Sequence, residues 1–198
     1  MHSLYEIETT VKRSAKSQGL SWGVSEEIGK AVRVLEQSGL RGLESFKSII
    51  DYGFDNLIKL KDINQKETSN LCPIHFGIFF QDQSHLKEMH QTFDFKSLQE
   101  PLISLPFLIK AAKKNLIYFH INSDNLNISI TPSEMTSIDQ NKIPNFISNF
   151  SIHVTPQRQN QYSDKTWEDL YQLSLETFVE ETEEKKLSGA GAGLSDND

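Results

Sequence analysis

NLIYFHINSDNLNISIT, residues 115–131, is the stretch of the chain that decides the fold. Apolar and polar residues alternate on both sides of Ser123-Asp124, and this is the period of a strand with one buried face. Ser123-Asp124 has the length and the residue types of a hairpin turn. The stretch therefore predicts an antiparallel hairpin. The same alternation in residues 73–81 and 149–155 predicts two further strands.

Helical spacing dominates residues 4–52, where three short helices are predicted. Ser3 and Glu6 form a capping box before the first helix, and Ser25 is the expected N-cap of the second. Gly29 lies inside the second helix, where glycine costs about 1 kcal/mol in helix propensity. A glycine inside a helix predicts that another backbone passes close to that face of the helix.

The rest of the chain supplies one surface connection, two helices and a tail. Residues 53–70 are predicted to be the connection, and residues 82–100 show only weak helical spacing. The apolar run 101–109 enters a short helix, and a final amphipathic helix begins near Thr166. The predicted fold class is α+β, with the N-terminal three-helix unit packed on a mainly antiparallel sheet. We expect one domain over residues 1–187, and the Gly/Ala-rich acidic tail 188–198 belongs to the same domain.

Composition and charge narrow the class of protein. With 37% hydrophobic and 24% charged residues, the chain has the composition of a folded domain. Its net charge is −7, and most of that charge lies after residue 164, where nine Asp and Glu stand against three Lys. Without a basic stripe, neither nucleic acid nor an anionic membrane surface is an expected partner.

The expected location is the cytoplasm. The chain shows no apolar run long enough to cross a bilayer and no secretory leader at its start. Its single cysteine, Cys72, fits a reducing compartment.

Several motifs resemble those of a bacterial family of proteins known only as a domain of unknown function. They are Leu4-x-x-Ile7-Glu8, Gly19-x-x-Trp22-Gly23-x-x-Glu26-Glu27-x-Gly29, Cys72-Pro73, Leu105-Pro106-Phe107 and the ending Gly189-Ala190-Gly191-Ala192-Gly193-Leu194-Ser195-Asp196-Asn197-Asp198. The chain departs from the family pattern at residues 179–186, where a Pro and an Arg are missing. The resemblance implies one family-wide domain that includes the tail, and no assigned activity.

The tail is the first candidate site. Its alternate glycines, Gly189, Gly191 and Gly193, allow a backbone to lie close against another surface. Asp196, Asn197 and Asp198 add oxygen atoms that suit capture in a groove or a hard cation. A frayed acidic tail is the alternative.

The second candidate is the segment around Trp22. Trp22 lies next to a glycine, and Glu26 or Glu27 could serve as a general base in a small-ligand pocket. An aromatic anchor beside two acids in the first turn of a helix explains the same residues without a ligand.

Histidine and cysteine provide weaker hypotheses. His75, His120 and His153 fall on the polar faces of their predicted strands, and a three-histidine metal site would form if those strands were neighbours. Unrelated histidines are the simpler interpretation, so no metal site is predicted and the cofactor is unknown. Cys72 as a nucleophile would need a base that the sequence does not locate.

Two functions follow from these residues. The first is a cytosolic accessory or ligand-binding protein that uses its acidic C-terminal segment to dock on a protein partner or a small polar molecule. The second is an enzyme for a small molecule, with the tail closing over the Trp22, Glu26 and Glu27 pocket. No sequence feature predicts the oligomeric state.

Overall fold

The computed structural model describes residues 2–63, 69–132, 142–157 and 162–177. The chain divides into two compact units, Met1–Arg158 and Gln159–Asp198. Each unit is described by itself.

Three helices form the N-terminal part of the first unit: α1 (Leu4–Ser17), α2 (Trp22–Gln37) and α3 (Gly42–Tyr52). The capping box of Ser3 and Glu6 is confirmed at the start of α1. The predicted cap of α2 was wrong: Ser21 accepts the hydrogen bond from the backbone N–H of Val24, one turn before Ser25. Ser25 is fully buried within the helix. The chain enters the helix before Trp22 because Ser21 satisfies an orphan donor there.

α1 packs closely on α2 at Gly29. A Cβ atom built on Gly29 would lie 2.8 Å from the backbone oxygen of Glu8. The predicted close approach of a second backbone is confirmed, and that backbone is α1.

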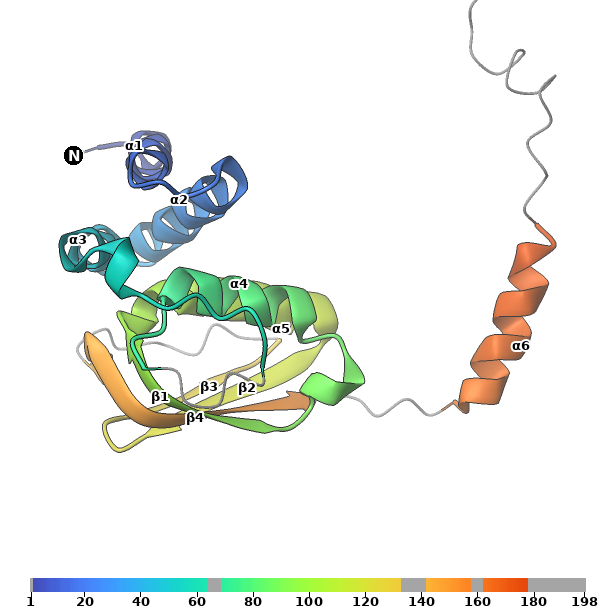
Figure 1. Cartoon of the computed structure of the whole chain (residues 1–198). Coiled ribbons are helices and arrows are strands. Elements are labelled where there is room, and N and C mark those ends of the chain that lie inside the picture. Colours follow the sequence, from blue (N-terminus) through green and yellow to red (C-terminus); the bar gives the residue numbers. More distant parts are fainter. Residues whose placement is uncertain (1, 64–68, 133–141, 158–161, 178–198) are drawn as a thin grey trace, which may run out of the picture. The chain divides into compact units, whose positions relative to one another are not determined.

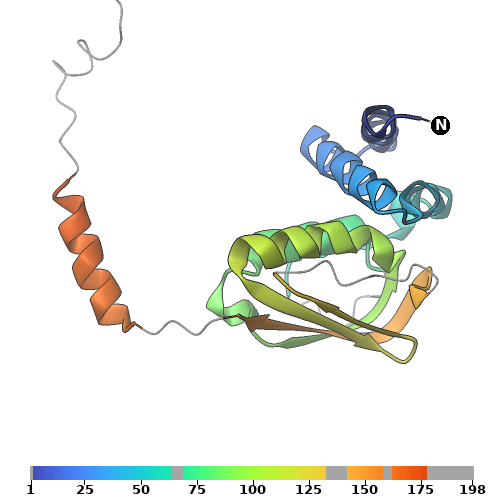
Figure 2. The same cartoon turned by 180° about the vertical axis from the view of Figure 1, so that it is seen from behind.

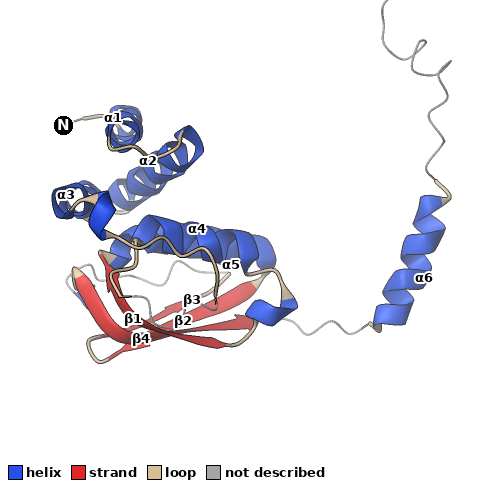
Figure 3. Cartoon of the chain, viewed as in Figure 1, coloured by secondary structure: helices blue, strands red, loops and turns tan. Residues whose placement is uncertain are grey.

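A four-stranded antiparallel sheet follows, with the strand order β1-β4-β2-β3 (Figure 3). Its strands are β1 (Thr92–Gln99), β2 (Ile117–Ser123), β3 (Leu126–Ile130) and β4 (Phe146–Pro156). The predicted hairpin is β2–β3, and the predicted strand at 149–155 is part of β4. The turn predicted at Ser123-Asp124 was one residue early, because Ser123 pairs with Leu126 and the turn is Asp124-Asn125. Residues 82–100 were expected to be weakly helical, and this was wrong for their second half, which forms β1. Phe93 and Phe95 there alternate with polar residues, as in a strand with one buried face.

Helices α4 (Pro73–Gln83) and α5 (Leu105–Asn115) lie side by side. The strand predicted at 73–81 was therefore wrong. Pro73 occupies the first turn of α4, where its fixed φ suits a helix and its missing N–H costs nothing. Three short 3-10 turns complete the described elements of the first unit: Phe54–Asn56, Lys87–Met89 and Pro101–Ser104.

The elements of the first unit form successive layers. Figures 1 and 2 show α4 and α5 covering one face of the sheet, and α1, α2 and α3 on the far side of those two helices. The α+β class is confirmed, and the N-terminal helices pack on the sheet through this middle layer. Buried phenylalanines of α4 and of three strands contact one another between the layers: Phe76, Phe80, Phe95, Phe119 and Phe150.

The outer side of β1 is bordered by the chain around Leu71. Leu71 forms isolated parallel bridges with Ile58 on one side and Leu98 on the other. Its N–H donates to Ser97 at 3.0 Å, and the Gln99 N–H donates to its carbonyl at 3.4 Å. Ile58, within the predicted surface connection, thus pairs with Leu71, which follows the connection and pairs with the edge of the sheet.

The second unit contributes one described helix, α6 (Asp164–Leu175), which Ser163 caps. Its large apolar side chains are exposed: Trp167, Leu170, Tyr171, Leu173 and Leu175. The domain boundary at 187 stays a prediction, and the tail residues 188–198 lie outside the described residues.

Candidate functional site

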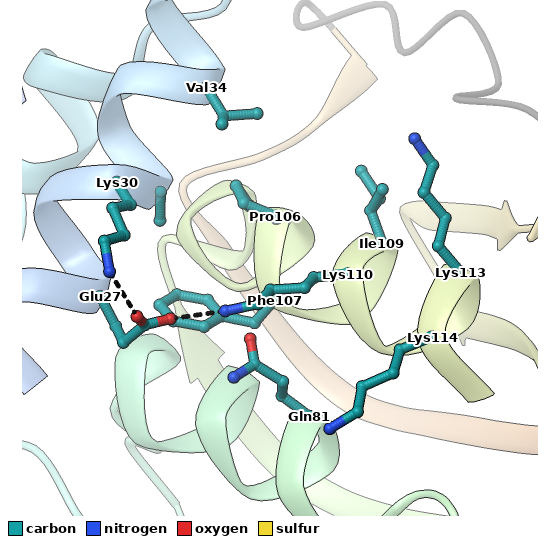
Figure 4. Close-up of a pocket in the computed structure, with 11 residues that line it drawn as sticks. Glu27, Lys30, Val34, Gln81, Pro106, Phe107, Ile109, Lys110, Lys113 and Lys114 are labelled. Carbon is teal, nitrogen blue, oxygen red and sulfur yellow. Dashed lines mark hydrogen bonds and ion pairs between the residues drawn. The ribbon is translucent and has the colours of Figure 1, made fainter. Parts of the chain in front are cut away.

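A groove of about 600 Å³ lies between α2, α4 and α5 (Figure 4). Its apolar floor comes from α2 and α5: Ala31, Val34, Pro106, Phe107 and Ile109. Its polar residues are Glu27, Lys30, Gln81, Lys110, Lys113 and Lys114. The site thus combines an apolar floor with four lysines in a chain of net charge −7.

Helix geometry explains why the lysines of α5 gather on one side. Lys110, Lys113 and Lys114 are spaced three and four residues apart, so they project from the same face. Two of them lie in the last turn of α5, where cations interact favourably with the helix dipole. The apolar residues Pro106 and Ile109 occupy the adjoining surface of the helix.

Phe107 reaches the bottom of the groove because α4 carries a glycine opposite it. The Phe107 side chain is almost fully buried, with 2% of its surface exposed. A Cβ atom on Gly77 would lie 2.7 Å from its ring, so only glycine leaves the ring in place. The small residue on α4 therefore shapes the floor of the groove.

Glu27 connects the two walls of the groove. Lys110 of α5 donates a hydrogen bond to one of its carboxylate oxygens at 2.9 Å, and Lys30 of α2 donates to the other at 3.1 Å. Figure 4 shows both ammonium groups directed at this carboxylate. Partial burial opposes ionisation of Glu27, but the two lysines outweigh it and lower its pKa. Glu27 is thus an ionised bridge between α2 and α5.

Gln81 offers an acceptor to the groove. Its side-chain oxygen Oε1 is buried and has no hydrogen-bond partner among the described residues. A buried acceptor without a partner costs about 1 to 3 kcal/mol.

A second hollow of about 490 Å³ adjoins the first and shares Glu27, Lys30 and Gln81 with it. Glu26 and Gly23 also line this hollow. The Glu27 bridge thus lies where the two hollows meet.

The predicted site residues of α2 are only partly brought together. Glu26 and Glu27 both line the hollows, but Trp22 lines neither of them. The Trp22 side chain is 57% exposed, and the ammonium of Lys16 lies 5.4 Å from its ring centroid. Trp22 is therefore a surface residue in a cation–π contact.

Glu26 forms ion pairs with Lys30 at 3.1 Å and with Lys12 at 3.6 Å. The hydrogen bond from Lys30 and the charge of Lys12 lower the pKa of Glu26. Both carboxylates proposed as general bases are therefore weakly basic.

The tail residues Gly189, Gly191, Gly193, Asp196, Asn197 and Asp198 lie outside the described residues, so their predicted role stays a prediction.

Buried Cys72 and half-buried His75 form a pair that lacks the charges of a catalytic dyad. The distance from the Cys72 sulfur to Nδ1 of His75 is 3.2 Å. Burial raises the pKa of the Cys72 thiol, and burial together with the charges of Lys59 and Lys61 lowers the pKa of His75 to about 4. Both side chains are thus neutral near pH 7, whereas an activated cysteine needs a thiolate.

Of the three histidines in the metal hypothesis, two lie close together on the sheet and the third lies elsewhere. His75 lies on α4, so the predicted three-strand arrangement was wrong. His120 and His153 do face each other across β2 and β4. No cluster of three or more His, Cys, Asp or Glu side chains that could hold a metal ion occurs in the part of the chain that the structure describes.

Sequence reasoning missed the lysines of α5, the acceptor of Gln81 and the apolar floor. Lys110-x-x-Lys113-Lys114 beside an apolar run was a readable signal, because its spacing defines one helix face. Gln81 could not be found in this way, since residues 73–81 were assigned the period of a strand.

Comparisons with known proteins give a family match over part of the chain and no activity. No curated protein and no solved structure matches the chain. Among the described residues, no helix combines the length and the apolarity that a membrane crossing requires. The matched family stretch, residues 2–84, contains α1 to α4 and therefore two of the three walls of the groove, while α5 lies beyond it. Over these residues the chain matches the family described as "Protein of unknown function (DUF3726)", which confirms the resemblance to a family of unknown function.

Proposed function

We propose that this chain is a binding protein whose ligand is an amphipathic anion held in the groove between α2, α4 and α5. The observation that carries the proposal is the apolar floor beside Lys30, Lys110, Lys113 and Lys114. An apolar group placed on such a floor gains roughly 25 cal/mol for each Å² removed from water. A carboxylate or phosphate at the rim gains charge-assisted hydrogen bonds from the lysines.

The Glu27 carboxylate occupies the position at the rim that the anionic group of a ligand would take. It accepts hydrogen bonds from Lys110 and Lys30. An anionic ligand replaces the Glu27 carboxylate at Lys110, and Glu27 keeps its bond to Lys30 on its own helix. Lys30 and Lys110 are thus already held by a carboxylate, and this lowers the cost of ordering them when another anion binds.

Binding is favoured over catalysis by the state of the two carboxylates. Lysines hold Glu26 and Glu27 ionised with lowered pKa values, and weak bases abstract protons poorly. Trp22 lines neither hollow. These observations support the ligand-binding function over the enzyme with a Trp22, Glu26 and Glu27 pocket.

Calorimetric titration with decanoate tests the proposal, with decylammonium as a matched cation of the same chain length. We expect decanoate to bind and decylammonium to bind far more weakly. Val34→Asp places a negative charge on the half-buried edge of the floor and is expected to abolish decanoate binding. Lys110→Ala is expected to weaken binding about fivefold to tenfold, since one charge-assisted hydrogen bond is lost.

Lys47→Ala is the matched control, because Lys47 lies on α3 in an exposed ion pair with Asp51. It is expected to bind decanoate like the wild type. Equal affinities for decanoate and decylammonium, or undiminished binding by Val34→Asp, would overturn the proposal.

The exposed apolar residues of α6 favour a second function, docking on a protein partner through the acidic C-terminal segment. Trp167, Leu170 and Tyr171 are spaced as the anchors of a helix that enters a groove. Glu168 and Asp169 flank them, so the partner proposed here carries an apolar groove with a basic rim. Partner capture by the full chain and by a Trp167→Ala, Leu170→Ala variant tests this function, and identical partner sets would refute it.

A further inference from the structure

The face of the sheet turned away from α4 and α5 carries a continuous row of four polar side chains. Thr92 of β1 pairs with His153 of β4, His153 pairs with His120 of β2, and His120 pairs with Ser129 of β3. The neighbouring residues Phe119, Ile121 and Ile152 are buried on the opposite face of the sheet. The row is therefore independent of the groove.

Both imidazoles of the row are held by a hydroxyl group at the same ring atom. Nδ1 of His153 lies 2.8 Å from the Thr92 hydroxyl, and Nδ1 of His120 lies 2.9 Å from the Ser129 hydroxyl. A ring whose Nδ1–H donates to an oxygen keeps the lone pair of Nε2 for a metal. Metal-binding histidines are typically oriented by such a hydrogen bond at their other nitrogen.

The two rings lie at a separation that one metal ion can span. Their centroids are 6.5 Å apart, with 32° between the ring planes. Metal–nitrogen bonds of about 2.0–2.1 Å place two ligating rings with centroids roughly 5 to 6.5 Å apart, depending on the angle at the metal. The observed distance is at the upper end of this range. Both side chains are exposed, so a small rotation about their side-chain bonds brings the rings closer.

We propose that His120 and His153 form a two-histidine site for a divalent late transition metal ion on the outer face of the sheet. Imidazole nitrogen suits Cu²⁺, Ni²⁺ and Zn²⁺, and the affinity rises from Ni²⁺ to Cu²⁺ and falls again at Zn²⁺. Water or a donor from another molecule completes the coordination. The sheet fixes both backbones through paired strands, so little order must be gained when the metal binds.

Titration of the full chain with CuCl₂, NiCl₂ and ZnCl₂ by isothermal calorimetry tests the site. We expect one equivalent to bind, most tightly for Cu²⁺. His120→Ala and His153→Ala are each expected to weaken binding at least tenfold, because either change leaves a single ligand. Ser129→Ala is expected to weaken it severalfold through loss of the bond that orients His120.

His85→Ala is the matched control, since His85 is also exposed but lies outside the strands. It is expected to bind Cu²⁺ like the wild type. In NMR spectra, paramagnetic Cu²⁺ is expected to broaden the signals of β2 and β4 first. Unchanged affinity in either histidine variant of the pair, or equal weakening by His85→Ala, would overturn the proposal. Decanoate binding is measured on the same variants and is expected to stay unchanged. The metal-site proposal and the groove proposal can therefore be refuted independently of each other.

Discussion

Gly77 of α4 lies against Phe107 of α5, and we expect Gly77→Ala to destabilise the folded chain. A Cβ atom at this position would lie 2.7 Å from Cδ2, 2.8 Å from Cγ and 2.9 Å from Cβ of Phe107. These atoms lie at the root of the ring, so no flexible chain end can move aside. Either the two helices separate, or Phe107 moves toward the groove.

The magnitude follows from two opposing effects. Overpacking of a buried contact costs typically about 1 to 3 kcal/mol. Alanine gains about 1 kcal/mol over glycine in a helix interior. The net loss in the free energy of unfolding is expected to be about 0 to 2 kcal/mol, which lowers Tm by up to roughly 8 °C in a unit of this size, and the loss relative to a helix glycine that gains from alanine is about 1 to 3 kcal/mol.

Urea unfolding followed by circular dichroism measures the effect, with Gly23→Ala as the control. Gly23 also lies on a helix, but a Cβ atom there would meet no other atom within 4 Å. Gly23→Ala is expected to leave stability unchanged or raise it slightly. If Gly77→Ala proved as stable as Gly23→Ala, the close contact between α4 and α5 would be refuted. A stable Gly77→Ala chain with unchanged decanoate affinity would also remove Phe107 from the floor of the groove.

Three further predictions concern packing and pH. Gly29→Ala places a Cβ atom 2.8 Å from the Glu8 oxygen and is expected to cost about 1 kcal/mol in urea unfolding, unlike Gly23→Ala. His75 stays neutral in the folded chain down to a pKa of about 4, whereas the unfolded chain takes up a proton near 6.5. Stability is therefore expected to fall as the pH drops from about 6.5 toward about 4, and His75→Gln should flatten this slope. Ionised Glu27 stabilises the fold above pH 4.5, and this contribution is lost as the pH falls through its lowered pKa. Glu27→Gln should remove the corresponding acid loss in denaturation curves recorded at several pH values.

The fold class could be predicted from the sequence, but one layer of it was misassigned. Residues 117–130 alternate because one face of the hairpin is buried and the other is exposed. α4 is buried against the sheet on one side and approached by α5 on another, so Ile74, Phe76 and Phe80 do not form a single stripe. A helix that is apolar on several sides loses its 3.6-residue period. The proline at its first position was the better guide.

Only the part of the candidate site that α2 contributes could be predicted from the sequence. Glu26 and Glu27 were identified from the loop and helix start that contain them, and both line the hollows. Lys110, a partner of Glu27, lies 83 positions further along the chain, and no local pattern connects the two. The lowered pKa of Glu27 depends on that distant contact together with Lys30. The full set of partners of Glu27 therefore becomes visible only after α5 has been placed.

The pairing of Leu71 with the edge of β1 also affects the tendency of the protein to aggregate at high concentration. Exposed strand edges are templates on which further chains can pair and aggregate. The chain satisfies part of the β1 edge with its own backbone at Leu71, whereas β3, at the opposite edge, has five residues and carries polar Asn127 and Ser129. The β3 edge is thus protected by its short length and polar residues, and the β1 edge by pairing with the chain at Leu71. Loss of the Leu71 pairing would therefore favour fibril growth from the β1 edge.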